Sequence, residues 1–312
     1  MSFTATEIYG QQMTHFVPVD RVALDVNQVR LAPSQVTLCG SDTDPFEFGD
    51  RSLVGHEVGG TIIEVGPGVT GWAVGDRVAA QAWPGLAEEV VVDAGLLVDA
   101  EGLPDPAIVE PLGCVINVLR RTGLRPGSDV VVVGATKSMG YLLTRLIASR
   151  YEPRTLVATG RRPGALANVE ALGATVVNTN RESLSAVVED VTEGRWPDVI
   201  FECTGVQGGL DLAHATIKRP FDRDKQRPNE HSTIVWVGWH LSSGGDRRLP
   251  LGVLNPNETR IVNAHFRNAE DVRSAMDAGA NMIRRGEIDL TGFITHRFGF
   301  SDQDVQRAFS TA

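Results

Sequence analysis

The 312-residue sequence predicts a two-domain α/β protein, in which a small β barrel or sandwich is followed by a doubly wound parallel sheet. The length is sufficient for two domains that each bury a core of their own. Roughly the first hundred residues contain short Val-rich segments between glycine-containing turns. After Pro126-Gly127, short apolar β-branched runs alternate with helical segments, which is typical of a parallel sheet covered on both faces.

The expected elements follow the chain in this order. In the first part, strands are expected at 59–66, 75–80 and 88–92. In the second part, we expect strands at 130–133, 156–158, 175–177, 199–203 and 233–237, and helices at about 139–149, 166–172 and 184–191. The charged segment from Lys218 to His231 contains two prolines and lacks periodicity, so we expect a surface loop there.

The composition is that of an acidic globular protein, with 42% hydrophobic residues, 22% charged residues and a net charge of −10. This charge argues against nucleic acid or an anionic membrane as the main partner, because both are bound through Lys and Arg. No apolar run reaches the length of a membrane span, and the N-terminus does not look like a signal peptide. The widely spaced Cys39, Cys114 and Cys203 do not make a disulfide framework. We therefore expect a cytoplasmic protein.

Three short motifs carry metal-binding chemistry: Cys39-Gly40-Ser41-Asp42, Gly55-His56-Glu57 and Glu110-Pro111-Leu112. They offer a thiolate, an imidazole and two carboxylates, a mixture of donors that suits zinc. Three protein ligands leave a fourth position open for water or substrate. Structural zinc sites are instead closed and cysteine-rich, with a short C-x-x-C spacing that this sequence lacks. The motifs therefore predict a catalytic metal.

A glycine-containing turn between the strand at 130–133 and the next helix lies where a dinucleotide fingerprint is expected. Such a turn lets the backbone approach a pyrophosphate at the helix N-terminus. The match is imperfect because Lys137 and Ser138 fill the middle of the turn. The candidate cofactor-binding residues here are Gly134, Thr136, Lys137, Ser138, Met139 and Gly140.

Gly160-Arg161-Arg162 follows the second strand of the parallel sheet, where the adenosine ribose would lie. An acidic residue at this point would accept a hydrogen bond from the 2′-hydroxyl of NAD. Two arginines instead favour a 2′-phosphate through charge-assisted hydrogen bonds. We therefore expect NADP(H) to be preferred over NAD(H), although a solvated basic turn has the same pattern.

The remaining cysteines and histidines have no ligand-like spacing. We expect Cys203 to be a small buried hydrophobe, and Cys114 to pack near the metal without binding it. His240 and His265 are candidates to line the active-site cleft.

Taken together, these motifs resemble the medium-chain dehydrogenase/reductase family, the relatives of zinc alcohol dehydrogenase. Within the family, the sequence is most similar to the polyol and glucose dehydrogenase branch. The resemblance covers nearly the whole chain. Beyond the motifs above, it includes Val65-Gly66-Pro67-Gly68-Val69, Gly75-Asp76-Arg77-Val78 and Val262-Asn263-Ala264.

The resemblance implies a GroES-like β-barrel catalytic domain at 1–120, completed by 286–312, and a Rossmann NADP-binding domain at 121–285. It implies an active site in the cleft between them. The segment from Val253 to Asn263 is expected to pair across a subunit interface, so a homodimer or homotetramer is expected.

The resemblance also implies roles for individual residues. Cys39, His56 and Glu110 would be zinc ligands, with Glu57 coordinating directly or lying just outside the ligands. Asp42 would orient His56, and Ser41 would hydrogen-bond the substrate hydroxyl and begin a proton relay. The cofactor contacts would include Thr204, Gly205 and Asn263.

The sequence departs from the family pattern in ways that shape the expected chemistry. The cysteine-rich lobe that holds a structural zinc in many relatives is missing, so one catalytic zinc alone is expected. Asp44 stands where alcohol dehydrogenases often have a relay histidine. The stretch from Cys39 to His56 is short, and its Asp44 and Glu47 would suit hydroxyl-rich or amine-bearing substrates.

The implied activity is hydride transfer between NADP(H) and a secondary alcohol or ketone, such as a sugar, cyclitol or polyol. Two alternatives remain open at this point. One is a zinc-free NADPH reductase of the quinone or enone type, which the missing lobe favours. The other is a non-catalytic NADP-binding sensor, which the altered glycine turn favours.

Overall fold

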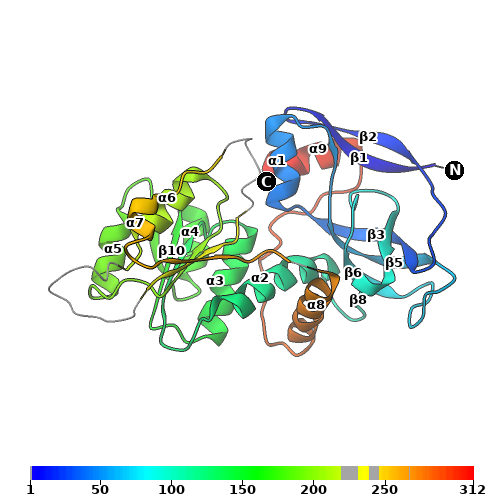
Figure 1. The fold of residues 1–312 in the computed structure, drawn as a ribbon. Coiled ribbons are helices and arrows are strands. Elements are labelled where there is room, and N and C mark those ends of the chain that lie inside the picture. The colour runs from blue at the N-terminus through cyan, green and yellow to red at the C-terminus, as the bar shows by residue number, and fades with distance from the viewer. Residues whose placement is uncertain (1, 219–230, 239–245, 267) are drawn as a thin grey trace. The chain divides into compact units, whose positions relative to one another are not determined.

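In the computed structural model of the protein, the described residues are 2–218, 231–238, 246–266 and 268–312. The chain forms two compact units (Figure 1). The barrel unit comprises Met1–Ile116 and Phe266–Ala312, and the sheet unit comprises Asn117–His265. His240 and residues 219–230 of the expected surface loop lie outside the described residues. None of the described helices is long and apolar enough to cross a membrane.

The barrel unit contains two antiparallel sheets, with strand orders β2-β1-β4 and β7-β3-β5-β6-β8. The strands are β1 (Ser2–Gly10), β2 (Met13–Asp20), β3 (Gln28–Thr37), β4 (Ser52–Leu53), β5 (Glu57–Val65), β6 (Arg77–Gln81), β7 (Val90–Asp93) and β8 (Val98–Asp99). Apolar residues two positions apart, such as Val29 and Leu31, face one core with Val58 and Ile62. The three strands expected in this part correspond to β5, β6 and β7.

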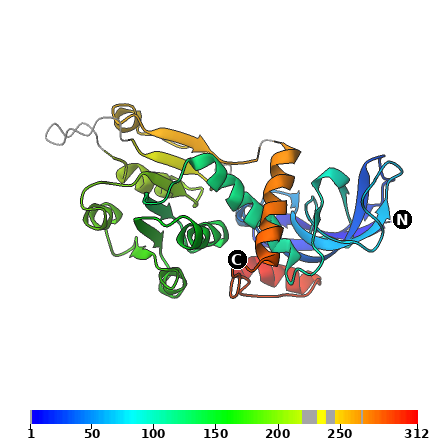
Figure 2. The ribbon, with the colours of Figure 1, turned by 90° about the horizontal axis from the view of Figure 1, so that it is seen from below.

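The helical segments of the barrel unit support these sheets. They are α1 (Gly40–Phe48), η1 (Ala94–Leu96), η2 (Pro106–Ile108), α2 (Val109–Thr122), which continues into the sheet unit, α8 (Ala269–Arg284) and α9 (Asp302–Thr311). Helix α8, orange in Figure 2, contacts β8 and η1. Val272 and Met276 share a core cluster with Val98, and a Cβ on Gly113 would lie 2.7 Å from Met276 Cγ. Residues 266–285 therefore lie in the barrel unit, which differs from the expected boundary at 286.

The C-terminal helix α9 packs on the N-terminal hairpin and is red beside the blue strands in Figure 1. The Gln306 side chain accepts the backbone N–H of Thr14 at 2.8 Å and donates to the carbonyl of Gln12 at 2.9 Å. Phe309 lies against Phe46, with ring centroids 5.1 Å apart. These contacts attach the two ends of the chain to one core.

The sheet unit contains a six-stranded parallel sheet in the order β11-β10-β9-β12-β13-β14. Its elements are β9 (Asp129–Val133), α3 (Ser138–Arg150), β10 (Thr155–Gly160), α4 (Pro163–Glu170), β11 (Thr175–Asn178), α5 (Leu184–Val191), β12 (Val199–Glu202), α6 (Gln207–Ala215), β13 (Thr233–Trp236), α7 (Leu251–Leu254) and β14 (Arg260–Asn263). The order of connection reverses between β9 and β12, as in the Rossmann fold. The expected doubly wound sheet is confirmed.

The segment from Val253 to Asn263, expected to pair across a subunit interface, is not one continuous strand. Residues Leu251–Leu254 form the short helix α7, and Arg260–Asn263 form β14 at the edge of the sheet. Pro256 lies between them, and proline cannot donate to a strand ladder.

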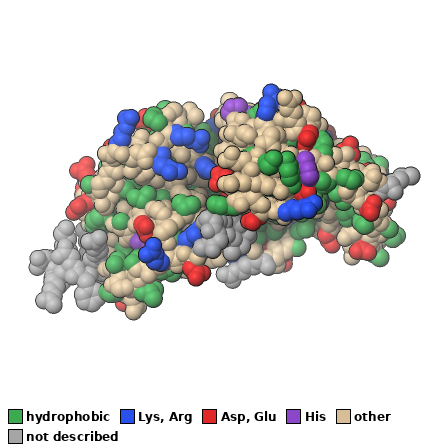
Figure 3. All heavy atoms as spheres, turned by 90° about the horizontal axis from the view of Figure 1, so that it is seen from above, with side chains coloured by type: hydrophobic (Ala, Val, Ile, Leu, Met, Phe, Trp, Pro, Cys, Tyr) green, Lys and Arg blue, Asp and Glu red, His purple; other side chains and the backbone are tan. Residues whose placement is uncertain are grey.

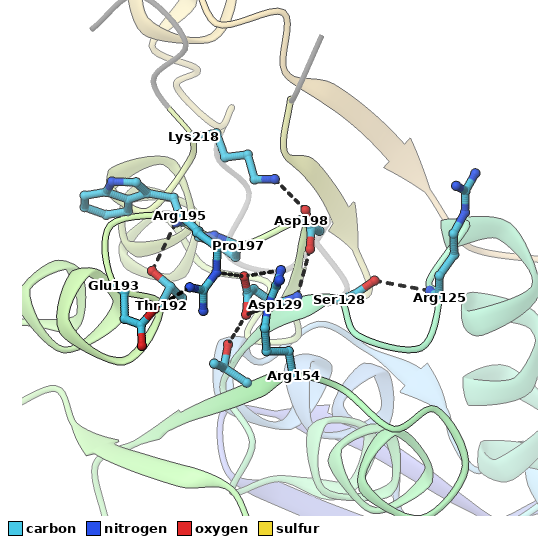
Figure 4. A network of polar contacts seen from close by, with 12 residues as sticks. Arg125, Ser128, Asp129, Arg154, Thr192, Glu193, Arg195, Pro197, Asp198 and Lys218 are labelled. Carbon is cyan, nitrogen blue, oxygen red and sulfur yellow. Dashed lines mark hydrogen bonds and ion pairs between the residues drawn. The ribbon is translucent and has the colours of Figure 1, made fainter. Parts of the chain in front are cut away.

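A buried carboxylate organises the amino end of the parallel sheet (Figure 4). Asp129, the first residue of β9, accepts hydrogen bonds from Arg154, Thr155 and Arg195. Its backbone N–H donates to Asp198, which also pairs with Lys218. The network joins the start of β9 to the start of β10 and to the segment before β12. It lies at the amino ends of the strands, and the glycine turn lies at their carboxyl ends.

Charged side chains of both signs occur on the surface. On the face drawn in Figure 3, Lys and Arg side chains are interspersed with Asp and Glu side chains.

Candidate functional site

A row of three side chains crosses the five-stranded sheet of the barrel unit. Thr37, the last residue of β3, pairs with Glu57 at the start of β5, and Glu57 pairs with Gln81 at the end of β6. Directly opposed residues in neighbouring antiparallel strands project from the same face. The Thr37 hydroxyl donates a hydrogen bond to Oε2 of Glu57. The register therefore places an acid between a hydroxyl and an amide.

His56 precedes β5 and is held by Asp42 from helix α1. The Asp42 carboxylate is buried, and its Oδ1 lies 3.3 Å from Nδ1 of His56. The same carboxylate accepts the backbone N–H groups of Gly55 at 2.9 Å and Cys39 at 3.1 Å. The ring of Trp83 stacks on the imidazole of His56, and the two ring centroids are 4.1 Å apart. These contacts leave Nε2 as the ring nitrogen available to a ligand.

Cys39 caps the N-terminus of α1 and completes a group of three potential ligands. The donor atoms of Cys39, His56 and Glu57 all lie within 4.8 Å of one another. Burial alone would lower the pKa of His56, but hydrogen bonds with Asp42 and Cys39 raise it to about 12. Burial and the Glu57 carboxylate raise the pKa of the Cys39 thiol. The surroundings of His56 thus favour a positive charge, while the thiol needs a nearby cation to ionise.

Glu110 lies in the first turn of α2 and is 2% exposed, as is Glu57. Its Oε1 accepts a hydrogen bond from Gln81 Nε2 at 2.6 Å and a weaker one from Cys114 Sγ at 3.5 Å. Burial raises the pKa of Glu110, and burial together with Glu110 raises the pKa of Glu57 to about 8. Glu110 is close enough to raise the pKa of Glu57, but its carboxylate does not belong to the group of three potential ligands.

The donor set fits a zinc ion. In the described part of the chain, neither Glu57 nor Glu110 forms an ion pair with Lys or Arg. Two buried carboxylates that share the His56 imidazole as their neighbouring positive group are unfavourable, and a divalent cation would neutralise them. A thiol, an imidazole and carboxylate oxygens are typical zinc donors. The chemistry of these residues therefore matches the expected metal.

Other residues expected near the metal take varied positions. Ser41 lies in the first turn of α1, half-buried beside Asp42, and Asp44 and Glu47 lie further along the same helix. Cys114 contacts Glu110, as expected for a residue packed beside the ligands. Cys203, expected to be a small buried hydrophobe, is partly buried directly after β12, where the chain leaves the sheet.

In the sheet unit, the glycine turn is tightly packed at the carboxyl ends of β9 and β12. Gly134 has a φ of 85°, and a Cβ there would lie 2.6 Å from Thr204 Cγ2. A Cβ on Gly140 would lie 2.2 Å from the Gly134 carbonyl. The Gly134 N–H donates to the Thr159 hydroxyl at 3.0 Å. This close approach of strand, turn and helix is what glycine supplies in a dinucleotide-binding turn.

The other turn residues surround the start of α3. Lys137 is the exposed N-cap of this helix and makes no side-chain cap, while Ser138 and Met139 form its first turn and are partly buried. The free N–H groups of a helix N-terminus attract anions. Thr136 lies against Gly160, because a Cβ on Gly160 would be 2.3 Å from Thr136 Cγ2.

The carboxyl end of β10 presents the expected arginines. Arg161 and Arg162 are both exposed, and Arg162 is the N-cap of α4. Because Thr136 fills the space beside Gly160, an acidic side chain at position 160 would collide with the turn. The carboxyl end of β10 thus carries two guanidinium groups, and position 160 has no room for a carboxylate side chain.

The remaining expected cofactor contacts lie at the ends of β12 and β14. Buried Glu202 holds the 203–206 turn: its carboxylate accepts hydrogen bonds from the Thr204 N–H at 2.8 Å and from the Thr204 hydroxyl, and its Oε2 accepts the Gly205 N–H at 3.3 Å. Asn263 is exposed at the end of β14, and its side chain accepts the N–H of His265. His265 is exposed next to it.

Sequence reasoning did not single out Thr37, Gln81 or Glu202 as site residues. Glu202 carried a signal, because it is an acid inside an otherwise apolar buried strand. Thr37 and Gln81 carried none, because their role depends on strand register, which the sequence does not reveal.

Comparison with known proteins gives a consistent picture. The alcohol dehydrogenase GroES-like domain matches residues 25–100. A sorbitol dehydrogenase from Gallus gallus is 30% identical over 320 residues, covering 87% of this chain and 83% of that protein. A protein from Sinorhizobium meliloti described as a zinc-binding dehydrogenase, solved bound to NADP, superposes with a TM-score of 0.74 at 19% identity, covering 93% of this chain and 90% of its own. A quinone oxidoreductase from Pseudomonas syringae superposes with a TM-score of 0.80 at 19% identity, covering 99% and 96%.

Proposed function

Because this chain belongs to the medium-chain dehydrogenase/reductase family, we propose that it is a zinc-dependent oxidoreductase that prefers NADP(H) over NAD(H). Its substrate would be a secondary alcohol or the corresponding ketone, of the sugar, cyclitol or polyol class. The single observation that carries the proposal is the convergence of Cys39, His56 and Glu57, whose donor atoms lie within 4.8 Å of one another.

The proposed metal site lies entirely in the barrel unit. Cys39, His56 and one or both of Glu57 and Glu110 would hold the ion. Bound zinc acts as a Lewis acid that lowers the pKa of an alcohol hydroxyl and polarises a ketone carbonyl. Asp42 fixes the orientation of the imidazole through Nδ1, and Thr37 fixes the Glu57 carboxylate through Oε2.

Proton movement falls to the residues of the first turn of α1. The Ser41 hydroxyl can accept the proton of the substrate hydroxyl in a hydrogen bond and pass on its own. Asp44 follows Ser41 by three residues on α1, so both lie on one side of the helix. Alcohol oxidation releases one proton and one hydride, and a bound nicotinamide cofactor would supply the acceptor for the hydride.

The preference for NADP(H) rests on the end of β10. Arg161 and Arg162 can donate charge-assisted hydrogen bonds to a 2′-phosphate. The tight packing of Gly160 against Thr136 also excludes the carboxylate that would bind the 2′-hydroxyl of NAD(H). The glycine turn and the first turn of α3 would hold the pyrophosphate.

The polyol class is supported by the sorbitol dehydrogenase relative and by acidic residues in α1, since carboxylates accept hydrogen bonds from hydroxyl groups. The test is a substrate screen of the purified protein. We expect NADP⁺ reduction with sorbitol or a related polyol, and little reduction with a simple hydrophobic secondary alcohol. Activity on the hydrophobic alcohol with none on polyols would refute the substrate class.

The second candidate is a zinc-free NADPH reductase for quinones, which the Pseudomonas syringae structure favours through its similar fold. Removal of bound metal with a chelator, followed by assays of alcohol oxidation and quinone reduction, distinguishes the two functions. Quinone reduction that survives removal of all metal would support the second candidate. A protein that binds NADPH but turns over neither class of substrate would instead be a sensor.

A further inference from the structure

Gln81 lies beside both carboxylates of the candidate metal site: its backbone is paired with Glu57, and its side-chain amide donates a hydrogen bond to Glu110. It is the last residue of β6 and the direct cross-strand partner of Glu57. Its Nε2 donates a hydrogen bond of 2.6 Å to Oε1 of Glu110, which comes from helix α2. A sheet residue thus holds a helix residue at the site.

The same oxygen of Glu110 receives a second protein donor. Cys114, one helical turn later on α2, places its Sγ 3.5 Å from Oε1. Both protein donors therefore act on Oε1, and in the described part of the chain no hydrogen bond is made to Oε2. Glu110 has one oxygen anchored by protein and one oxygen left for another partner.

The chemistry of residue 81 suits a neighbour of a cation. An amide donates a hydrogen bond to a carboxylate but carries no charge of its own. A Lys or Arg in this place would neutralise Glu110 and repel a metal ion. A glutamine can therefore orient Glu110 while leaving its negative charge available.

We propose that Gln81 is the positioning residue of Glu110: by anchoring Oε1, it presents Oε2 to the metal ion that Cys39 and His56 bind. This inference rests on the proposed zinc-dependent function. Cys114 assists Gln81 as a weaker donor to the same oxygen and is not itself a ligand. The Gln81–Glu110 pair thus adds β6 to the elements that build the metal site.

The barrel unit contains a matched pair that serves as the control. Gln35 of β3 donates its Nε2 to Oδ1 of Asp105 at 2.6 Å, the same kind of amide–carboxylate contact at the same length. Both glutamines are partly buried, and the Gln35 pair includes none of the candidate ligands. Gln81→Met and Gln35→Met each remove one amide–carboxylate hydrogen bond while keeping side-chain length. Gln35→Met also removes the bond from the backbone N–H of Ala107 to Gln35 Oε1, so it is the more disruptive change for the fold.

The experiment measures zinc affinity by competition with a chromophoric chelator, and the visible spectrum of the Co²⁺-substituted protein. We expect Gln81→Met to weaken zinc binding by about 10- to 100-fold and to alter the Co²⁺ d–d bands, as loss of an outer hydrogen bond to a ligand does. Gln35→Met should leave both unchanged. Urea unfolding of both variants controls for stability, which should fall at least as much in Gln35→Met as in Gln81→Met, because Gln35→Met loses the additional bond from Ala107.

Each outcome bears on the inference. If wild-type protein binds zinc and Gln81→Met binds it equally well with an unchanged Co²⁺ spectrum, the positioning role is refuted and the proposed function stands. If the wild-type protein binds no zinc, both are refuted. A Cys114→Ser variant should retain the sulfur-to-cobalt charge-transfer band of Cys39 at full intensity, and loss of half its intensity would make Cys114 a ligand instead.

Discussion

The Asp42 carboxylate and the His56 imidazole form the contact on which the geometry of the candidate metal site depends. Asp42 Oδ1 lies 3.3 Å from His56 Nδ1, and the Asp42 side chain also binds the backbone on either side of the site, at Cys39 and Gly55. One buried side chain therefore sets the position of two candidate ligands at once.

Replacement of Asp42 by Ala should weaken zinc binding by about 10- to 100-fold, because His56 loses the partner that orients it. The backbone N–H groups of Cys39 and Gly55 would also lose their acceptor. Chelator competition measures the effect. Asp42→Asn keeps one oxygen acceptor and should be affected less. Equal zinc affinity in Asp42→Ala and wild type would contradict the role of this residue.

Replacement of Arg161 and Arg162 by Ala should reduce NADPH affinity about tenfold or more while leaving NADH affinity unchanged. Each charge-assisted hydrogen bond to a phosphate contributes about 1.5–3 kcal/mol, and NADH lacks that phosphate. Fluorescence titration with both cofactors measures the ratio. Arg125→Ala, an exposed arginine just before β9 at the opposite end of the strands, is the control and should bind both as wild type does. An equal loss of affinity for NADPH and NADH would show that the arginines do not bind the 2′-phosphate.

Replacement of Asp129 by Asn should destabilise the sheet unit by about 2 kcal/mol at neutral pH, because the hydrogen bonds from Arg154 and Arg195 lose their charged acceptor. Burial would raise the pKa of Asp129, but the hydrogen bonds from Arg154, Thr155 and Arg195 outweigh it, and the net pKa is lowered. The folded-state pKa thus lies below that of the unfolded chain.

The sign of the pH effect follows from this lowered pKa. The contribution of Asp129 to stability is complete above about pH 4, the ordinary aspartate pKa, and is lost as the pH falls through the lower folded-state value. Urea unfolding at a series of pH values should show wild type and Asp129→Asn converging in acid. A difference that stays constant down to the lowest pH at which the chain folds would contradict the assignment.

Replacement of Phe309 by Ala should lower the free energy of unfolding of the barrel unit by about 3 kcal/mol, because this 3% exposed ring packs on Phe46. Phe298, which is 39% exposed, provides the comparison, and Phe298→Ala should cost under about 1 kcal/mol. Chemical denaturation measures both. Equal effects of the two substitutions would mean that α9 is not part of the core.

Much of the architecture could be read from the sequence. The continuous apolar strands of the sheet unit, such as Val130–Val133, have no polar side to confuse their assignment, and the alternation with helices fixes the class of sheet. The proximity of Cys39 and His56 could also be anticipated from the sequence, because Cys and His are rare residue types and occur here in short motifs.

Long-range packing could not be read in the same way. The sequence of α8 is amphipathic wherever it packs, so nothing local assigns it to the barrel unit through Met276 and Gly113. The choice between Glu57 and Glu110 as the neighbour of Cys39 depends on where α2 meets the sheet. The position of Gln81 beside Glu57 follows from the register between β5 and β6, which the sequence does not reveal.

The measurement that tests the central proposal most directly is the zinc content of the purified wild-type protein beside that of Cys39→Ala. The account predicts about one zinc ion per chain in wild type, since the sequence offers one set of catalytic donors and no cysteine-rich structural site. It predicts loss of that zinc in Cys39→Ala, with NADPH binding by the sheet unit retained. A wild-type chain that carries no zinc after purification in zinc-containing buffer, yet binds NADPH, would contradict it.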